Sequence, residues 1–376
     1  MVISQYIGKR ETDHAGETAT QLLTASVLLS VVISAFVLVA NESLMRLLFG
    51  KVEADVMDAC VTYLRISAYS YPALAIYNAG AALYRSFGRT STTMYLSIAS
   101  NILNIIGNCI GVFVLHAGVA GVAWPSLIAR TFSAVVITGL CFSRKNQVRY
   151  LKNWILRLDG AIQRLILGIA IPNGVESGIF QLVKVALSSV AAMFGTYQIA
   201  ANGVAQSIWS LAALVCVSMG SVFITVIGQC MGAGEVEQAE LYFKKLMKIT
   251  LVFAVAWNIL IFAITPVVLS FYALEEKTKQ LIVLLVLIHN VCNAIAFPFA
   301  DPLGKGLRAA GDVQFTMIIS LATTIGVRLV FSIFFGIILN MGVIGIAFAM
   351  CLDWIIRGGI FILRERGGKW KRFRVI

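Results

Sequence analysis

The stretch SQYIGKRETDHA at residues 4–15 returns in altered form as GQCMGAGEVEQA at residues 228–239. Two further pairs of blocks keep nearly the same offset: YRSFGRTSTTMYLSIAS (84–100) with LRAAGDVQFTMIISLAT (307–323), and AGVAGVA (117–123) with MGVIGIA (341–347). Three separate blocks that keep one register over more than half of the chain's length predict two copies of one structural unit.

The composition indicates that lipid surrounds most of this repeat protein. The chain has 376 residues, of which 59% are hydrophobic and 13% charged, and its mean hydropathy is +0.87. Soluble domains are roughly 45–50% apolar and about 25% charged. So apolar a chain has too little polar surface for a water-soluble fold. We therefore expect an all-α polytopic membrane protein made of two pseudo-symmetric helical bundles.

Ten stretches are long and apolar enough to cross a bilayer, which takes about 20 residues of helix. They lie at roughly 20–40, 61–83, 93–115, 118–142, 165–194, 198–227, 244–271, 279–303, 313–339 and 341–363. Four belong to the first copy and six to the second. Because the counterparts of residues 165–227 would precede Met1, we expect a first repeat that lacks two helices, against six plus six in an intact member.

This pattern predicts four segments along the chain: an incomplete N-lobe at 1–142, a basic cytoplasmic linker at 143–164, a C-lobe at 165–363 and a basic cytoplasmic tail at 364–376. Most of the 30 lysines and arginines lie in the linker, the tail and alternate loops. The positive-inside rule then places both chain ends in the cytoplasm. We expect a multi-pass monomer of the plasma (inner) membrane, whose net charge of +12 reflects topology rather than a nucleic-acid partner.

Enzymatic chemistry is not indicated. The three histidines do not cluster, and the seven cysteines show no CxxC or zinc-ligand spacing. The glycine-rich GQCMGAGE lacks the GK[ST] of a phosphate-binding loop. We therefore expect neither an enzyme nor an ATP-driven pump, and no cofactor.

The repeat blocks, together with IPNGVESGIFQL (171–182) and FGTYQIAANGVAQSI (194–208), resemble the multidrug and toxic compound extrusion (MATE) family of antiporters. The resemblance extends over nearly the whole chain. It implies two lobes around a central cavity and export of drug-like, cationic or amphipathic xenobiotics by alternating access, in exchange for Na⁺ or H⁺. The acidic coupling residue that many relatives carry on their first helix has no counterpart in this sequence.

Three carboxylates lie inside predicted spans: Glu176, Asp301 and Asp353. A charged side chain at mid-membrane costs at least about 2.5–3.5 kcal/mol, so such residues tend to face cavities and carry function. Glu176 follows Pro172 and Gly174, and Asp301 lies between Pro298 and Pro302.

We expect Glu176 and Asp301 to bind the coupling cation, either a shared Na⁺ or protons, and the resemblance places family carboxylates at both positions. The alternatives are ion pairs of Glu176 with Lys184 and of Asp301 with Lys305. For Asp353 we favour a structural ion pair with Arg357, four residues on.

Polar and aromatic residues within the spans are candidates for lining the cavity. Asn101, Asn104 and Asn108 share one helix face, which indicates either a cavity or a helix–helix contact. The other candidates are Arg65, Phe180, Lys184, Asn202 and Asn293.

Two other functions are compatible with the sequence. A lipid-linked saccharide flippase of the same superfamily would carry a more basic cavity, and few Arg or Lys lie in the spans. A truncated, non-transporting product would follow if the incomplete first repeat cannot fold.

Overall fold

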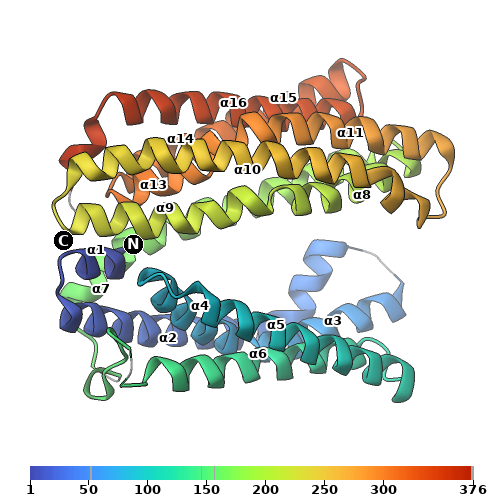
Figure 1. Cartoon of the computed structure of the whole chain (residues 1–376). Coiled ribbons are helices and arrows are strands. Elements are labelled where there is room, and N and C mark those ends of the chain that lie inside the picture. The colour runs from blue at the N-terminus through green and yellow to red at the C-terminus, as the bar shows by residue number, and fades with distance from the viewer. Residues whose placement is uncertain (51–52, 145, 156, 374–376) are drawn as a thin grey trace. The chain divides into compact units, whose positions relative to one another are not determined.

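Figure 1 shows the computed structural model of the chain, which describes residues 1–50, 53–144, 146–155 and 157–373. Within this described part every regular element is a helix, which confirms the predicted all-α class. The α-helices are α1 (Val2–Gly8), α2 (Thr12–Phe49), α3 (Ala54–Tyr69), α4 (Tyr71–Ser86), α5 (Thr90–Cys109), α6 (Ala120–Cys141), α7 (Gly160–Ala192), α8 (Thr196–Ala212), α9 (Leu214–Gly232), α10 (Val236–Ser270), α11 (Glu276–Ile295), α12 (Phe297–Ala300), α13 (Pro302–Ala309), α14 (Val313–Thr323), α15 (Val330–Ile333) and α16 (Val343–Arg366). The π-helices are η1 (Ile110–Val114), η3 (Thr324–Leu329) and η4 (Phe334–Ile338), and the 3₁₀-helices are η2 (Lys152–Trp154) and η5 (Lys369–Arg372).

Among the described residues, nine helices are long and apolar enough to cross a membrane. Of the span predicted at 198–227, only the α9 part is among them, because the stretch is divided at Ala213 from α8, of 17 residues. The span predicted at 61–83 is absent from them because it is divided at Ser70 between α3 and α4, of 16 residues each. Pro72 explains the break, since it has no N–H to donate to the carbonyl of Ala68. Ser34 of α2 donates to that carbonyl instead, at 2.8 Å. The chain is a multi-pass membrane protein.

The predicted repeat is visible in the backbone. Left-handed residues recur at matching positions of the two copies: Arg10 with Gly234, Gly88 with Gly311, His116 with Asn340, and Gly118 with Gly342. The π-helices η1 and η4 also occupy matching positions. The two copies therefore share these turns and one π-helix position.

The described residues form two compact units, each described here by itself: an N-terminal unit of residues 10–166, and a C-terminal unit of residues 1–9 and 167–376. In the N-terminal unit, α4 packs against α2 and α6, and α5 packs against α6. Bonds from Leu151 N–H to Thr20 Oγ1 (2.9 Å) and from Gln163 Nε2 to Gln21 Oε1 (2.8 Å) fasten the connection between α6 and α7 onto α2.

In the C-terminal unit, α9 lies beside α10 and α13, and α8 lies against α11 (Figure 1). The helix α1 packs on α9 through the motif that the sequence repeats. A Cβ atom on Gly8 would overlap the backbone of Gln229, and one on Gly232 would overlap the backbone of Gln5. The two copies of the motif therefore contact each other, and glycine lets their backbones approach closely.

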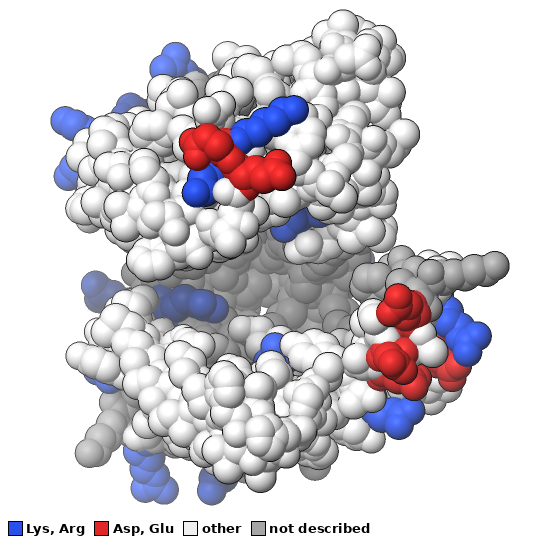
Figure 2. Space-filling view, turned by 90° about the vertical axis from the view of Figure 1, so that its right-hand side faces the viewer, with Lys and Arg blue, Asp and Glu red and all other residues white. Residues whose placement is uncertain are grey.

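The surface fits a lipid environment. Many large apolar side chains are exposed, including Val39 at 89% and Leu47 at 81%. On the face drawn in Figure 2, acidic and basic residues occupy a small part of the described surface. The linker predicted at 143–164 and the tail predicted at 364–376 include residues 145, 156 and 374–376, which lie outside the described part.

Candidate functional site

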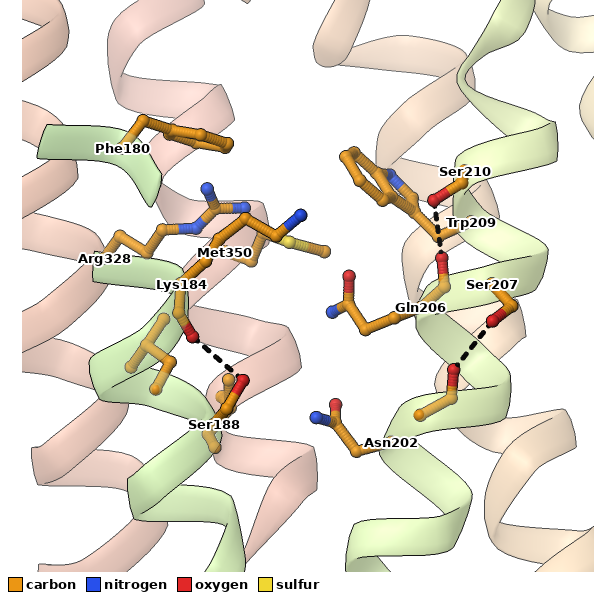
Figure 3. Close-up of a pocket in the computed structure, with 13 residues that line it drawn as sticks. Phe180, Lys184, Ser188, Asn202, Gln206, Ser207, Trp209, Ser210, Arg328 and Met350 are labelled. Carbon is orange, nitrogen blue, oxygen red and sulfur yellow. Dashed lines mark hydrogen bonds between the residues drawn. The ribbon is translucent and has the colours of Figure 1, made fainter. Parts of the chain in front are cut away.

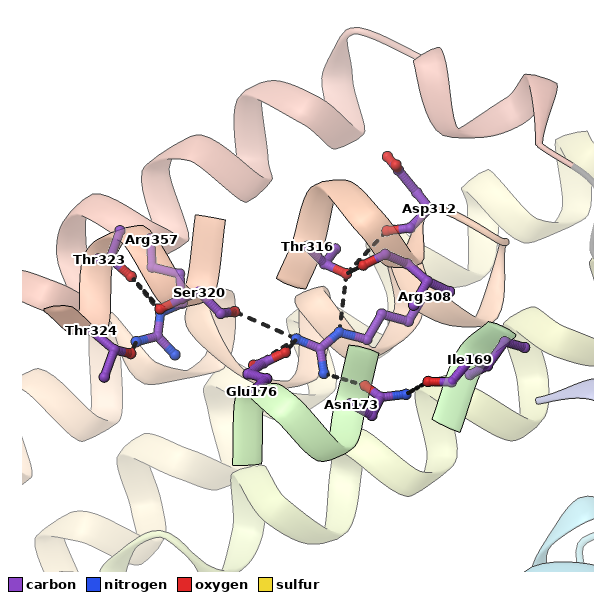
Figure 4. A network of polar contacts seen from close by, with 11 residues as sticks. Ile169, Asn173, Glu176, Arg308, Asp312, Thr316, Ser320, Thr323, Thr324 and Arg357 are labelled. Carbon is purple, nitrogen blue, oxygen red and sulfur yellow. Dashed lines mark hydrogen bonds and ion pairs between the residues drawn. The ribbon is translucent and has the colours of Figure 1, made fainter. Parts of the chain in front are cut away.

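Glu176 lies in α7 and forms an ion pair with Arg308 of α13, with 2.6 Å between Glu176 Oε2 and Arg308 Nη2 (Figure 4). The two side chains are 18% and 13% exposed. Arg308 also donates to Asn173 Oδ1 at 2.8 Å and to Thr316 Oγ1 at 3.0 Å. One guanidinium thus ties α7 to α13 and α14.

This geometry corrects the ion pair that the sequence suggests for Glu176. The partner is Arg308 rather than Lys184, which lies two turns farther along the same helix. Arg308 belongs to a helix, although its charge suggests a cytoplasmic loop. Spacing within one helix identifies neighbours on that helix only, so a partner 132 positions away is not visible in it.

Asp301 lies between α12 and α13, where Pro302 begins the second of these helices. It forms an ion pair with Lys305 at 2.8 Å, which is the alternative that the spacing suggests. The Lys305 side chain lies against Gly220 of α9. Among the described residues, Glu176 and Asp301 bond different basic residues of α13, and a Na⁺ site shared by the two stays a prediction.

Asp353 is fully buried in α16, and both of its oxygens accept hydrogen bonds from Arg357, at 2.6 and 2.7 Å. The same guanidinium donates to Thr323 Oγ1 and Thr324 Oγ1, at 3.0 and 2.9 Å (Figure 4). The expected ion pair is therefore present, and it holds the start of the π-helix η3.

A cavity of about 310 Å³ lies in the C-terminal unit between α7, α8, η3 and α16. It brings together three of the predicted lining residues: Phe180, Lys184 and Asn202 (Figure 3). Lys184 and Arg328 point into it from one side, and Gln206 and Trp209 of α8 lie opposite. The Arg328 guanidinium lies over the Phe180 ring, 5.0 Å from the ring centre to Cζ.

The asparagines of the N-terminal unit divide between the two roles that their spacing allows. Asn104 donates to Ser126 Oγ of α6 at 2.9 Å and so stabilises a helix–helix contact, while Asn108 donates to Asn104 within α5 at 3.1 Å. Asn101 lines a cavity of about 160 Å³ together with Arg130. Arg65 is exposed on α3 and does not line this cavity.

Asn293 lies away from the 310 Å³ cavity. It is fully buried in α11 and donates to Asn258 Oδ1 of α10 at 3.1 Å. Asn290 donates to the carbonyl of Asn258 at 3.3 Å. These amides join α10 to α11.

The sequence reasoning missed the arginines of the two cavities. Arg328 is buried at 3% exposure within an apolar run, and Arg130 donates to Ser70 Oγ at 2.6 Å. The rule that singles out intramembrane carboxylates applies equally to arginines, and would have found both. Within the described residues no group of three or more His, Cys, Asp or Glu is placed to hold a metal ion.

Comparison with known proteins gives consistent matches. The MatE family profile matches residues 1–110 and 172–334. The uncharacterized transporter YisQ of Bacillus subtilis is 26% identical over 98% of this chain and 81% of its own length. The probable multidrug resistance protein YoeA of the same organism is 24% identical over 87% of this chain and 72% of its own length.

Solved structures confirm the fold. The outward-facing conformation of a multidrug resistance MATE family transporter of the MOP superfamily matches with a TM-score of 0.90 at 21% identity. The match covers 99% of this chain and 83% of that one.

Proposed function

The chain belongs to the MatE family of multidrug transporters, and we propose that it exports small drug-like, cationic or amphipathic molecules in exchange for Na⁺ or H⁺. The probable multidrug resistance protein among its relatives supports this substrate class. We further propose that the chain is a monomer of the plasma (inner) membrane with its C-terminus in the cytoplasm; the distribution of basic residues supports this orientation.

The observation that carries the proposal is the ion pair between Glu176 and Arg308 inside the C-terminal unit. The Glu176 carboxylate can be neutralised by either of two partners, the Arg308 guanidinium or the coupling cation. While Arg308 is bound, the pair is neutral. A Na⁺ or H⁺ that binds Glu176 takes the place of the guanidinium and leaves Arg308 with Asn173, Thr316 and Ser320.

When the cation replaces Arg308 at Glu176, the ion pair that links α7 to α13 is lost. Pro172 lies inside α7, one turn before Glu176, and leaves the carbonyl of Gly168 without its helical donor. Binding of Na⁺ or H⁺ to Glu176 then makes α7 easier to bend at Pro172, where a helical hydrogen bond is already missing. The Asp301–Lys305 pair on α13 provides a second carboxylate for the same cation or for a second one.

Coupling to transport needs a difference in cation affinity between two states of the protein. In the mechanism we propose, the lobes alternate in access to the two sides, and the cation favours the state that releases substrate outward. Such a ligand shifts the equilibrium only by its differential affinity for the two states.

The test is ethidium transport by purified protein in liposomes, with a Na⁺ gradient and a pH gradient imposed separately. We expect transport to follow one of the gradients and to stop when an ionophore collapses it. Absence of transport under both gradients, or transport unchanged by their collapse, would contradict antiport.

A lipid-linked saccharide flippase is the second candidate, and one observation favours it. Both Lys184 and Arg328 line the 310 Å³ cavity, so it is more basic than the sequence suggests. Redistribution of a fluorescent anionic lipid between leaflets in the same liposomes, without any gradient, would distinguish this function from antiport.

A further inference from the structure

We propose that the 310 Å³ cavity of the C-terminal unit binds an anionic oxygen group, such as a carboxylate, on an amphipathic substrate. The inference rests on the proposed export function and adds an anionic class to its substrates, while cations such as ethidium would bind elsewhere in the protein. It assigns the recognition of charge to Arg328 and Lys184, and contact with the apolar body to Phe180 and Trp209.

Two of the described residues that line this cavity carry buried hydrogen-bond donors without partners. Arg328 Nη1 and Trp209 Nε1 are both buried, and neither has a hydrogen-bond acceptor among the described residues. Lys184 is exposed to the cavity on the neighbouring helix (Figure 3). A buried donor without an acceptor is costly, and a ligand oxygen at this position would remove that cost.

No acid among the described lining residues balances the two positive charges. Asp353 is close enough to interact electrostatically with Arg328, but both of its oxygens accept from Arg357. Three bases therefore share one acid in this region. The remaining polar lining consists of amides and hydroxyls, which are neutral. The cavity consequently favours an anion and disfavours an organic cation.

The aromatic residues of the cavity indicate the chemical nature of the rest of the ligand, to which the anionic group is attached. Phe180 covers one face of the Arg328 guanidinium, and Trp209 stacks on Trp354 with ring centres 5.8 Å apart. A flat apolar body fits between such rings, with its charged end at the two bases. The ligand class of this cavity is therefore a small aromatic or apolar organic anion.

The backbone gives a second, independent argument. Arg328 lies on the π-helix η3, whereas the matching part of the first copy is the regular helix α5. The other two π-helices, η1 and η4, match each other across the two copies, so among the described residues η3 is particular to the second copy. Single-turn π-helices are frequent at functional sites, where they redirect a side chain.

The test is equilibrium binding to the purified full chain in phosphatidylcholine nanodiscs, without ion gradients, measured by calorimetry. The probes are 2-naphthoate and 2-naphthylmethylammonium, which share an apolar body and differ in charge. We expect 2-naphthoate to bind more tightly. Arg328→Gln should weaken its binding at least about tenfold, as expected for loss of a hydrogen bond to a charged group.

Two further variants control for folding and for net charge. Lys184→Gln changes an exposed side chain, so it keeps the test valid if Arg328→Gln does not fold, and we expect it to weaken 2-naphthoate binding severalfold. Lys277→Gln removes one positive charge from the same unit, outside the cavity lining, and should leave binding unchanged. Tighter binding of the ammonium probe, or no effect of Lys184→Gln, would overturn the proposal.

A lipid headgroup could supply the same anionic oxygens. Adding phosphatidylglycerol to the nanodiscs should displace 2-naphthoate if the lipid is the source, and should leave it bound if a soluble anion is. Because this binding assay uses no ion gradient, absence of 2-naphthoate binding would not contradict the proposed antiport. Failure of gradient-driven ethidium transport would likewise leave the anion site standing.

Discussion

Arg308 of α13 and Glu176 of α7 meet at 2.6 Å although 132 positions separate them in the sequence. The segment between these two residues makes up more than half of the C-terminal unit's sequence. In space the pair links α7, which carries Pro172, to α13, which begins directly after Asp301. The carboxylate proposed to bind the coupling cation is therefore held by the base that the cation must displace.

A double-mutant cycle measures this coupling. Arg308→Met should destabilise the protein by about 3 kcal/mol, because it leaves a mostly buried carboxylate without its counter-charge. Adding Glu176→Gln should restore part of that loss, so that the double variant is more stable than the sum of the single effects. Thermal unfolding in detergent is the measurement. Additive effects would contradict an energetic coupling between the two residues.

Two of the intramembrane carboxylates, Asp353 and Asp301, should differ in their effect on stability. Asp353 is fully buried, and Asp353→Asn should cost about 3–5 kcal/mol because Arg357 loses its acid. The Asp301–Lys305 pair is 26–28% exposed, so Asp301→Asn should cost about 1 kcal/mol or less. Unfolding midpoints of the two variants test this order. A larger loss of stability in Asp301→Asn than in Asp353→Asn would show that burial of the ion pair does not determine the size of the loss.

The contact between the two copies of the quoted motif predicts a stability effect at Gly232. Gly232→Ala places a methyl group where the Gln5 backbone lies, and should cost about 1–3 kcal/mol through overpacking. Gly203→Ala is the matched control, since nothing lies within 4 Å of its added Cβ. There we expect a gain of up to about 1 kcal/mol from helix propensity. Equal unfolding temperatures for the two variants would contradict the packing described.

Pro172 should matter for transport more than for stability. Pro172→Ala restores the hydrogen bond to the Gly168 carbonyl and straightens α7, so the fold should be at least as stable as before. If α7 bends there during transport, ethidium flux should fall severalfold. Flux measured in liposomes at matched protein content tests this, and a wild-type rate would exclude a hinge at Pro172.

Much of the fold follows from local sequence signals. The offset between the quoted blocks predicts where left-handed residues recur, and His116 with Asn340 confirms it although neither is glycine. Spans follow from apolar length alone. The division at Ser70 was missed because the apolar stretch continues through it, although Pro72 marks the position.

The site is harder to predict because its contacts join distant segments. Phe180, Lys184 and Asn202 were found as polar or aromatic residues in spans, and the cavity brings them together. The predicted partner of Glu176 was wrong because helical spacing considers only bases on the same helix, such as Lys184. Arg328 was missed because only carboxylates were treated as intramembrane charges, although it lies in an equally apolar run.

Substrate exchange by Glu176→Gln in liposomes tests most directly whether the cation acts at Glu176. The account predicts that this variant still exchanges labelled for unlabelled ethidium at equal concentrations, but no longer accumulates it against its gradient when Na⁺ or H⁺ is supplied. Glu237→Gln, an exposed carboxylate on α10, should behave as wild type in both assays. Gradient-driven accumulation at the wild-type level in Glu176→Gln would contradict the account.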